Sequence, residues 1–266
     1  MSTPTSSTFL ITAAAARDTA WDAIVIGAGM GGSATAYALV RAGFKVLVIE
    51  RGLGELTETS DIGNHLEDPD DRMRIGRWPT RLSGTVDDRD FDFFAPLGSG
   101  AGGSTVLYAA ALDRFRHSDF APRPHPAGGT LEWPFAYDAL TPFYAEAEQK
   151  LDVSGTADPL GSDSGSLPEP PPLSPRDSDL FARFQSAGLN PYRLHHGYRF
   201  APDCGPCLGR VCLKNCKRHA ANAFLEPALV TGHLAILSET EVTRFEAGTD
   251  RVEAVHVVTD GEAYRL

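Results

Sequence analysis

The chain has 266 residues, of which 42% are hydrophobic, and it carries 35 acidic against 24 basic side chains, a formal net charge of −11. This length and apolar content allow one large domain or two modest ones with a sizeable core. The acidic balance argues against a nucleic-acid or anionic-membrane partner, because both would repel the protein at long range, and small molecules are the expected ligands.

The N-terminal segment, residues 1–20, is rich in Ser, Thr and Ala and has no basic residue before Arg17. A secretory signal begins with basic residues, so this segment predicts a flexible arm and not a signal peptide. No stretch approaches the roughly 18 apolar residues that span a bilayer. We therefore expect a cytoplasmic protein without a transmembrane segment.

Residues 22–50 read DAIVIGAGMGGSATAYALVRAGFKVLVIE and predict a strand, a tight turn, a helix and a second strand. Gly27, Gly29 and Gly32 have the G-x-G-x-x-G spacing, which permits the turn, the approach of a pyrophosphate and close packing of helix on strand. Glu50 ends the second strand, where its carboxylate can accept hydrogen bonds from ribose hydroxyls. The unit predicts a dinucleotide site that suits NAD as well as FAD.

A second glycine-rich stretch, LGSGAGGSTVLYAAALDRFR, covers residues 97–116 and leads directly into an apolar run. An isolated loop of this kind is often a flexible connection. A backbone this bare can also lie against a flat ring system, and its N–H groups can donate to flavin or phosphate oxygens. Its position before buried structure favours the binding loop.

Three stretches together resemble the glucose-methanol-choline (GMC) oxidoreductases, a family of FAD enzymes that oxidise alcohols. They are the first glycine motif with the following VIERG, the loop GSGAGGSTVLYAAALDRF, and LEWPFAYDALTPFYAEAEQKLDVSG at 131–155. The third is similar to a run in the family's bacterial dehydrogenase branch. The resemblance implies an FAD-dependent oxidoreductase that acts on CH–OH groups of an alcohol, polyol or sugar.

The resemblance also implies which positions bind FAD: the first glycine loop with the residues after the second strand, the second glycine loop, and a strand near the adenine. They are Gly27, Gly29, Gly32, Glu50 and Arg51, then Gly98, Gly103 and Ser104, and finally Val242. A hydrophobic residue at position 242 is equally expected in any half-buried strand.

The predicted fold class is α/β, a Rossmann-like βαβ FAD-binding domain with part of an α+β substrate domain. Residues 21–150 form the first part of the FAD-binding domain, 151–203 enter the substrate domain with a Pro/Ser-rich linker, and 204–266 hold a cysteine-rich loop and return to the FAD-binding domain. His195 and His196 are predicted at a surface or domain interface, because their position does not match the family's catalytic histidine.

The last residues, VEAVHVVTDGEAYRL, predict a β-hairpin with a turn at Asp260 and Gly261. In the resembled family a second flavin loop, the substrate sheet and the catalytic His pair come after this point. We therefore expect the N-terminal half of the enzyme, with its C-terminal half missing, no catalytic residue in the chain and no turnover by it alone. The alternatives are a non-catalytic nucleotide-binding fragment and a metal or iron–sulfur electron-transfer module.

All four cysteines, Cys204, Cys207, Cys212 and Cys216, lie within thirteen residues in the spacing C-x2-C-x4-C-x3-C. The absence of a secretion signal disfavours disulfides, and zinc usually takes paired C-x2-C knuckles. Close-spaced thiolates also suit iron–sulfur clusters. Sugar-oxidising members of the resembled family that pass electrons to a cytochrome carry a [3Fe-4S] cluster on C-x4-C-x3-C. The cysteines thus predict a cluster with a cytochrome or quinone acceptor, structural thiols, or zinc.

Overall fold

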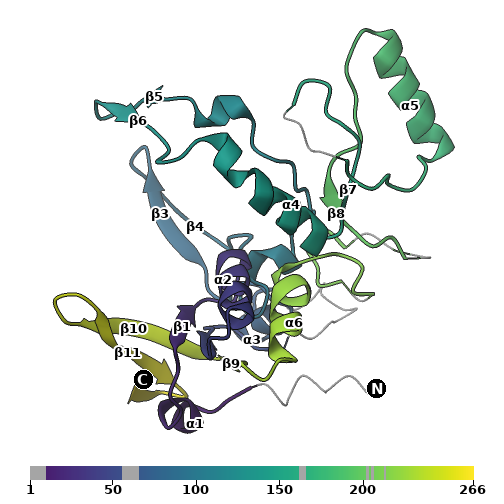
Figure 1. Cartoon of the computed structure of the whole chain (residues 1–266). Coiled ribbons are helices and arrows are strands. Elements are labelled where there is room, and N and C mark those ends of the chain that lie inside the picture. The colour runs from purple at the N-terminus through teal and green to yellow at the C-terminus, as the bar shows by residue number, and fades with distance from the viewer. Residues whose placement is uncertain (1–9, 56–65, 162–165, 202–203, 205–206, 213) are drawn as a thin grey trace. The chain divides into compact units, whose positions relative to one another are not determined.

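The computed structural model forms two compact units (Figure 1). Unit 1 comprises residues 1–109 and 205–266, and unit 2 comprises residues 110–204. Within them, the structure describes residues 10–55, 66–161, 166–201, 204, 207–212 and 214–266.

Unit 1 is built on a parallel sheet of three strands in the order β1-β2-β9. β1 (Ala23–Ile26) is followed by helix α2 (Met30–Arg41), which crosses over to β2 (Val46–Ile49), and β9 (Leu234–Leu237) joins from the far end of the chain. Every residue of β2 is buried, as a continuous apolar run in a parallel strand predicts. This confirms the predicted Rossmann-like βαβ unit.

A separate cluster of buried residues packs against each side of this sheet. On one face Val46 and Val48 pack with Ala36 and Val40 of α2 and with Leu225, which precedes α6 (Glu226–Leu229). Leu47 and Ile49 point to the other face because side chains alternate along a strand. There they pack with α1 (Ala13–Arg17) and β11 (Val252–Thr259).

β11 is the middle strand of an antiparallel sheet, between β10 (Thr240–Ala247) and β12 (Glu262–Arg265). Asp260 and Gly261 connect β11 to β12 with φ angles of 50° and 76°. Two consecutive positive φ angles define the two-residue turn that matches the twist of a hairpin. The predicted hairpin is confirmed.

Unit 1 also has short elements between β2 and Val106, and a π-helix, Ala221–Leu225, that leads directly into α6. Helix α3 (Pro69–Arg74) begins after Asp68, whose side chain accepts from the first-turn N–H groups of Asp70 and Asp71. A hairpin of β3 (Leu82–Val86) and β4 (Arg89–Phe93) follows, and a single 3-10 turn covers Gly103–Val106.

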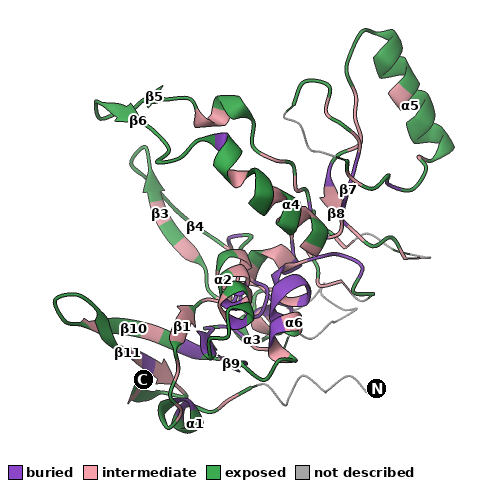
Figure 2. Cartoon of the chain, in the orientation of Figure 1, coloured by how far each residue is buried: buried purple, intermediate pink, exposed green. Residues whose placement is uncertain are grey.

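In its described residues, unit 2 has two α-helices and two short strand pairs (Figure 1). β5 (Arg123–Pro124) pairs with β6 (Thr130–Leu131), and β7 (Val153–Ser154) pairs with β8 (His196–Gly197). The helices are α4 (Thr141–Lys150) and α5 (Pro175–Ser186), and α5 is exposed apart from the half-buried Phe181 (Figure 2). Further 3-10 turns cover His117–Phe120 and Tyr137–Leu140.

The boundary between the units lies at residue 110, whereas the sequence pattern placed the first domain boundary at 150/151. The reason is that residues 110–112 hydrogen-bond to the β8 region, through the N–H of Leu112 to the carbonyl of His195 and the N–H of Gly197 to the carbonyl of Ala110. Arg114 adds a bidentate ion pair to Glu148 of α4, with both N···O distances 2.6 Å.

The longest helices of the described residues, α2 and α5, have 12 residues each. None of the helices that the structure describes has the length and apolar character needed to cross a bilayer.

The core predicts how stability responds to truncation. Replacing the fully buried Leu47 by Ala should lower the free energy of unfolding by about 2–5 kcal/mol, because a cavity is left between the sheet, α1 and β11. Urea unfolding followed by far-UV circular dichroism measures it. Leu180→Ala on exposed α5 is the matched control and should change it by no more than about 0.5 kcal/mol. Equal losses in both variants would contradict this core.

Candidate dinucleotide-binding site

The first glycine loop has the backbone geometry that its spacing predicts. Gly27 has a φ of 89°, which favours glycine, and its N–H donates to the carbonyl of Ile49 at 2.7 Å. A Cβ on Gly32 would lie 1.9 Å from the carbonyl oxygen of Gly27, so only glycine allows this approach of helix to loop. Gly27 therefore makes the turn and Gly32 the close packing.

Gly29 is the N-cap residue of α2, and no side chain caps this helix end. The first turn of α2 contains no acidic residue, and nothing lies within 4 Å of the place a Cβ on Gly29 would take. The N–H groups of a helix N-terminus and the positive end of its dipole favour an anion. The structure therefore leaves open space where a pyrophosphate would bind.

The carboxylate of Glu50, directly after β2, joins three segments of backbone. One oxygen accepts from the N–H of Ala28 at 2.7 Å, and the other accepts from Gly52 at 2.8 Å and Gly100 at 3.1 Å. The residue is 8% exposed. A carboxylate has about four lone-pair positions, so these donors leave one for a ligand hydroxyl.

The second glycine loop lies directly on the first. The N–H of Gly102 donates to the carbonyl of Ala28 at 2.9 Å. A Cβ on Gly103 would lie 2.9 Å from the Cα of Gly29, and Gly103 itself has a φ of 55°. The N–H of Gly98 donates to the Ser104 hydroxyl at 2.9 Å. Two loops without side chains between them therefore form one continuous surface of backbone, which can approach a flat cofactor.

Two other predicted positions lie on neighbouring surface. The guanidinium of Arg51 lies over the Trp78 ring, 3.8 Å from its centroid, and 3.8 Å from the carboxylate of Glu241. Val242 lies on β10, half-buried against the cluster that includes Leu47. Their contacts to a cofactor stay predictions, as do those of the glycines, Glu50 and Ser104.

Two of the four cysteines, Cys212 and Cys216, lie close together. The sulfur atoms of Cys212 and Cys216 are 3.4 Å apart, and Cys216 is buried. Burial raises the pKa of Cys212, but hydrogen bonds from the backbone N–H of Lys217 and from Cys216 outweigh burial and hold this pKa below its ordinary value. Within the described residues, no three His, Cys, Asp or Glu side chains converge as a metal site. The ligand set Cys204, Cys207, Cys212 and Cys216 stays a prediction.

Lys217 is a fully buried lysine that ties the cysteine segment to the second glycine loop. Its ammonium donates to the carbonyls of Arg210 at 2.8 Å, Cys207 at 2.9 Å and Tyr108 at 3.3 Å. Burial lowers its pKa, while the nearby thiols of Cys207, Cys212 and Cys216 act in the opposite direction. The sequence pattern offered no signal for this role, because the acceptors are backbone carbonyls.

The segment after Lys217 makes further bonds to the same loop. The Tyr108 hydroxyl donates to the carbonyl of Arg218 at 2.6 Å, and the N–H of Ala220 donates to the Thr105 hydroxyl at 2.9 Å. Burial raises the pKa of Tyr108 to about 12, so its phenol stays protonated at neutral pH.

His195, in unit 2, is 3% exposed, so of its two predicted positions the surface one is wrong, and the domain-interface one stays a prediction. The physical reason is the close approach of the segment after β7: a Cβ on Gly155 would lie 2.5 Å from the ring of His195, and Nε2 of the ring lies 2.8 Å from the carbonyl oxygen of Thr156. Its neighbour His196 is half-buried in β8 and lies 3.4 Å from the Ser154 hydroxyl.

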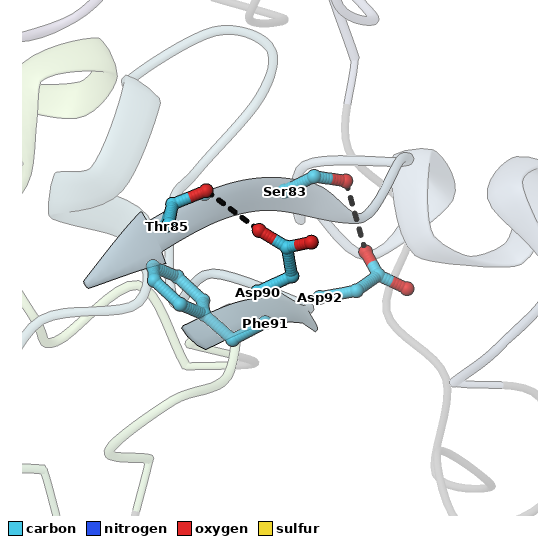
Figure 3. A pocket seen from close by; sticks show the side chains of 6 residues that line it. Ser83, Thr85, Asp90, Phe91 and Asp92 are labelled. Atoms are coloured by element: carbon cyan, nitrogen blue, oxygen red, sulfur yellow. Dashed lines mark hydrogen bonds between the residues drawn. The ribbon is translucent and has the colours of Figure 1, made fainter. Parts of the chain in front are cut away.

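The β3–β4 hairpin forms a wide, open hollow of about 480 Å³ (Figure 3). Its two carboxylates are bonded across the hairpin, Asp90 to the Thr85 hydroxyl at 2.7 Å and Asp92 to the Ser83 hydroxyl at 3.5 Å (Figure 3). These polar groups hold the hairpin together, and we assign no ligand to the hollow.

Comparisons with known proteins agree with this geometry. Residues 25–63 match the NAD(P)-binding Rossmann-like domain. The chain is 31% identical over 252 residues to paromamine 6'-oxidase of Streptomyces fradiae, covering 91% of this chain and 44% of that protein. It is 32% identical over 158 residues to 2-methyl-1,2-propanediol dehydrogenase of Mycolicibacterium austroafricanum, covering 58% and 28%.

Among solved structures, pyridoxine 4-oxidase from Mesorbium loti is similar in fold, with a TM-score of 0.56, 23% identity, and coverage of 93% of this chain and 48% of that one. The fold and the site thus define a Rossmann-like α/β domain for a dinucleotide cofactor. The chain is a homologue of the GMC-type oxidoreductases, which confirms the resemblance. It spans less than half the length of these relatives.

The half-buried His219, next to the second glycine loop, predicts a pH dependence. Burial, followed by the charges of Lys217 and Arg218, lowers its pKa to about 4, against an ordinary value near 6.5. Between these values the unfolded chain binds a proton that the folded chain does not, so the free energy of unfolding should fall as the pH drops from about 6.5 to 4, by up to about 1.4 kcal/mol per pH unit.

Urea unfolding at several pH values measures this dependence. His219→Gln should flatten the profile between pH 6.5 and 4 relative to the wild type, while the exposed His233→Gln should not. A parallel profile in wild type and His219→Gln would contradict the assignment.

Proposed function

We propose that the chain is the FAD-binding part of a GMC-type oxidoreductase that oxidises a CH–OH group of an alcohol, polyol or sugar. The observation that carries this proposal is the joining of two glycine loops by one buried carboxylate, Glu50, at the start of α2. The first loop alone suits NAD or FAD. The second bare loop beside it favours a cofactor with a flat ring system, and homologues named as an oxidase and a dehydrogenase support the reaction class.

Each part of the site would hold one part of FAD. The pyrophosphate would bind at the N-terminus of α2 beside Gly29, and the ribose would donate to the remaining lone pair of Glu50. The second loop would border the pyrophosphate and the ring with Gly98, Gly103 and Ser104. Arg51 and Val242 would lie on the adenine side. A bound flavin would supply the acceptor for the substrate hydride.

The chain's own residues then bind and orient, and none is assigned as the base that takes the hydroxyl proton. Lys217 and Tyr108 hold the second loop against the cysteine segment. We derive no electron-transfer step through the cysteines, because three sulfur atoms do not converge in the described part of the chain. The cytochrome or quinone acceptor therefore stays a prediction. A cytoplasmic location stays a prediction of the sequence pattern.

The test is cofactor binding to the purified chain, measured by titration calorimetry with FAD, ADP and NAD. We expect FAD to bind more tightly than ADP or NAD, because only its ring system uses the second loop. Gly32→Ala should weaken the affinity for FAD at least about tenfold, since the added Cβ would overlap the carbonyl of Gly27 and displace α2 from the loop.

Gly31→Ala is the matched control, because a Cβ there meets nothing within 4 Å, and it should bind FAD like the wild type. Equal affinity for FAD and ADP would mean that the chain binds the nucleotide but has no flavin site. Tighter binding of NAD than of FAD would mean that NAD is the cofactor. Both results would contradict the proposal, as would unchanged binding by Gly32→Ala.

A further inference from the structure

Cys212 and Cys216 are two nucleophilic side chains of unit 1 that the proposed function does not use. Their sulfur atoms lie 3.4 Å apart. A disulfide bond joins two sulfurs at about 2.05 Å, so a shift of about 1.4 Å would bring this pair to bonding distance. Movements of this size lie within what side-chain rotation provides, and the pair is therefore placed for reaction.

A turn of the backbone holds the two sulfurs near each other. The N–H of Asn215 donates to the carbonyl of Cys212 at 3.2 Å, and Asn215 has a φ of 50°, a left-handed conformation that asparagine tolerates well. The side chain of Asn222, which is 4% exposed, donates to the side-chain oxygen of Asn215 and to the carbonyl of Lys217. This buried amide connects both sides of Cys216, so the approach of the sulfurs belongs to the fold.

The two thiols differ in access and in their hydrogen bonds. Cys216 is 2% exposed, whereas Cys212 is half-buried and can be reached from solvent. The backbone N–H of Lys217 donates to the sulfur of Cys212 at 3.5 Å. A hydrogen bond to sulfur favours the thiolate, which is the form that attacks a disulfide. Cys212 therefore has the properties of an attacking thiol, and Cys216 those of the thiol that reacts second.

We propose that Cys212 and Cys216 form a reversible thiol–disulfide site that reacts with small-molecule disulfides such as oxidised glutathione. The Cys212 thiolate attacks one sulfur of the small disulfide, which forms a mixed disulfide and releases one thiolate. Cys216 then loses its proton and attacks the sulfur of Cys212, which forms the internal disulfide and releases the second thiolate. The two protons from the cysteines go to the two released thiolates. The pair is thus oxidised by two electrons, and the small disulfide is reduced to two thiols.

A metal ion fits the pair less well than a disulfide. Structural zinc takes four ligands, and in the described residues no third His, Cys, Asp or Glu side chain joins these two thiols. A disulfide needs the two sulfurs alone. The reversible form also agrees with the separation of 3.4 Å, because the structure has the reduced pair with its sulfurs not bonded.

The experiment exposes the purified full chain to oxidised glutathione at neutral pH, after its zinc and iron content has been measured. Remaining thiols are then alkylated and the peptides are identified by mass spectrometry. We expect a disulfide between Cys212 and Cys216, which reduced glutathione reverses. Cys204→Ser, which changes an exposed cysteine of unit 2, is the matched control and should form the same disulfide at the same rate.

Two further variants separate the roles of the two thiols. Cys216→Ser should keep one glutathione on Cys212, because the second thiol is missing. In Cys212→Ser the buried Cys216 should react with oxidised glutathione at least about tenfold more slowly than Cys212 does in Cys216→Ser. Circular dichroism of each variant confirms that it is folded.

Four outcomes would overturn the proposal. They are no disulfide between Cys212 and Cys216, a disulfide that joins either of them to another cysteine instead, equal reaction rates of the two single thiols, and zinc or iron in the purified chain that protects both. The reaction needs no flavin and no turnover, so its result is independent of the proposed function.

Discussion

The carboxylate of Glu50 is the interaction on which the candidate site depends. It accepts hydrogen bonds from Ala28 in the first glycine loop, from Gly52 after β2 and from Gly100 in the second loop. A buried carboxylate is costly unless such donors surround it, so the negative charge holds these three segments in one place. The glycines bring the loops to backbone contact, and the carboxylate secures them. A dinucleotide surface at the N-terminus of α2 follows from both.

Local patterns predicted much of unit 1. The apolar run of β2, the periodicity of α2 and the spacing of Gly27 and Gly32 all depend on residues close in sequence, and the structure has them as predicted. The same is true of the Asp-Gly turn before β12. Glu50 was predicted to face a ribose, but its bond to Gly100 links residues fifty positions apart, which no local pattern indicates.

The features that sequence patterns missed depend on contacts between distant segments. The bonds of residues 110–112 to the β8 region group these residues with unit 2, and His195 beside them is buried. Lys217 is held by carbonyls, which have no side-chain signature. The spacing of the cysteines predicted ligands, and this stays a prediction; the structure adds that the sulfur atoms of Cys212 and Cys216 lie 3.4 Å apart. The β3–β4 hairpin was likewise not predicted, and its turn uses Asp87 and Asp88, both with positive φ.

The central claim is that one carboxylate joins both glycine loops, and amide hydrogen exchange in the full chain tests it most directly. Exchange at Ala28, Gly52 and Gly100 is compared between the wild type and Glu50→Gln, with Val48 in β2 as an internal reference. If Glu50 joins the loops, all three amides exchange at least about tenfold faster in the variant while Val48 keeps its protection. Unchanged exchange at Gly100, or a change confined to Gly52, would contradict it.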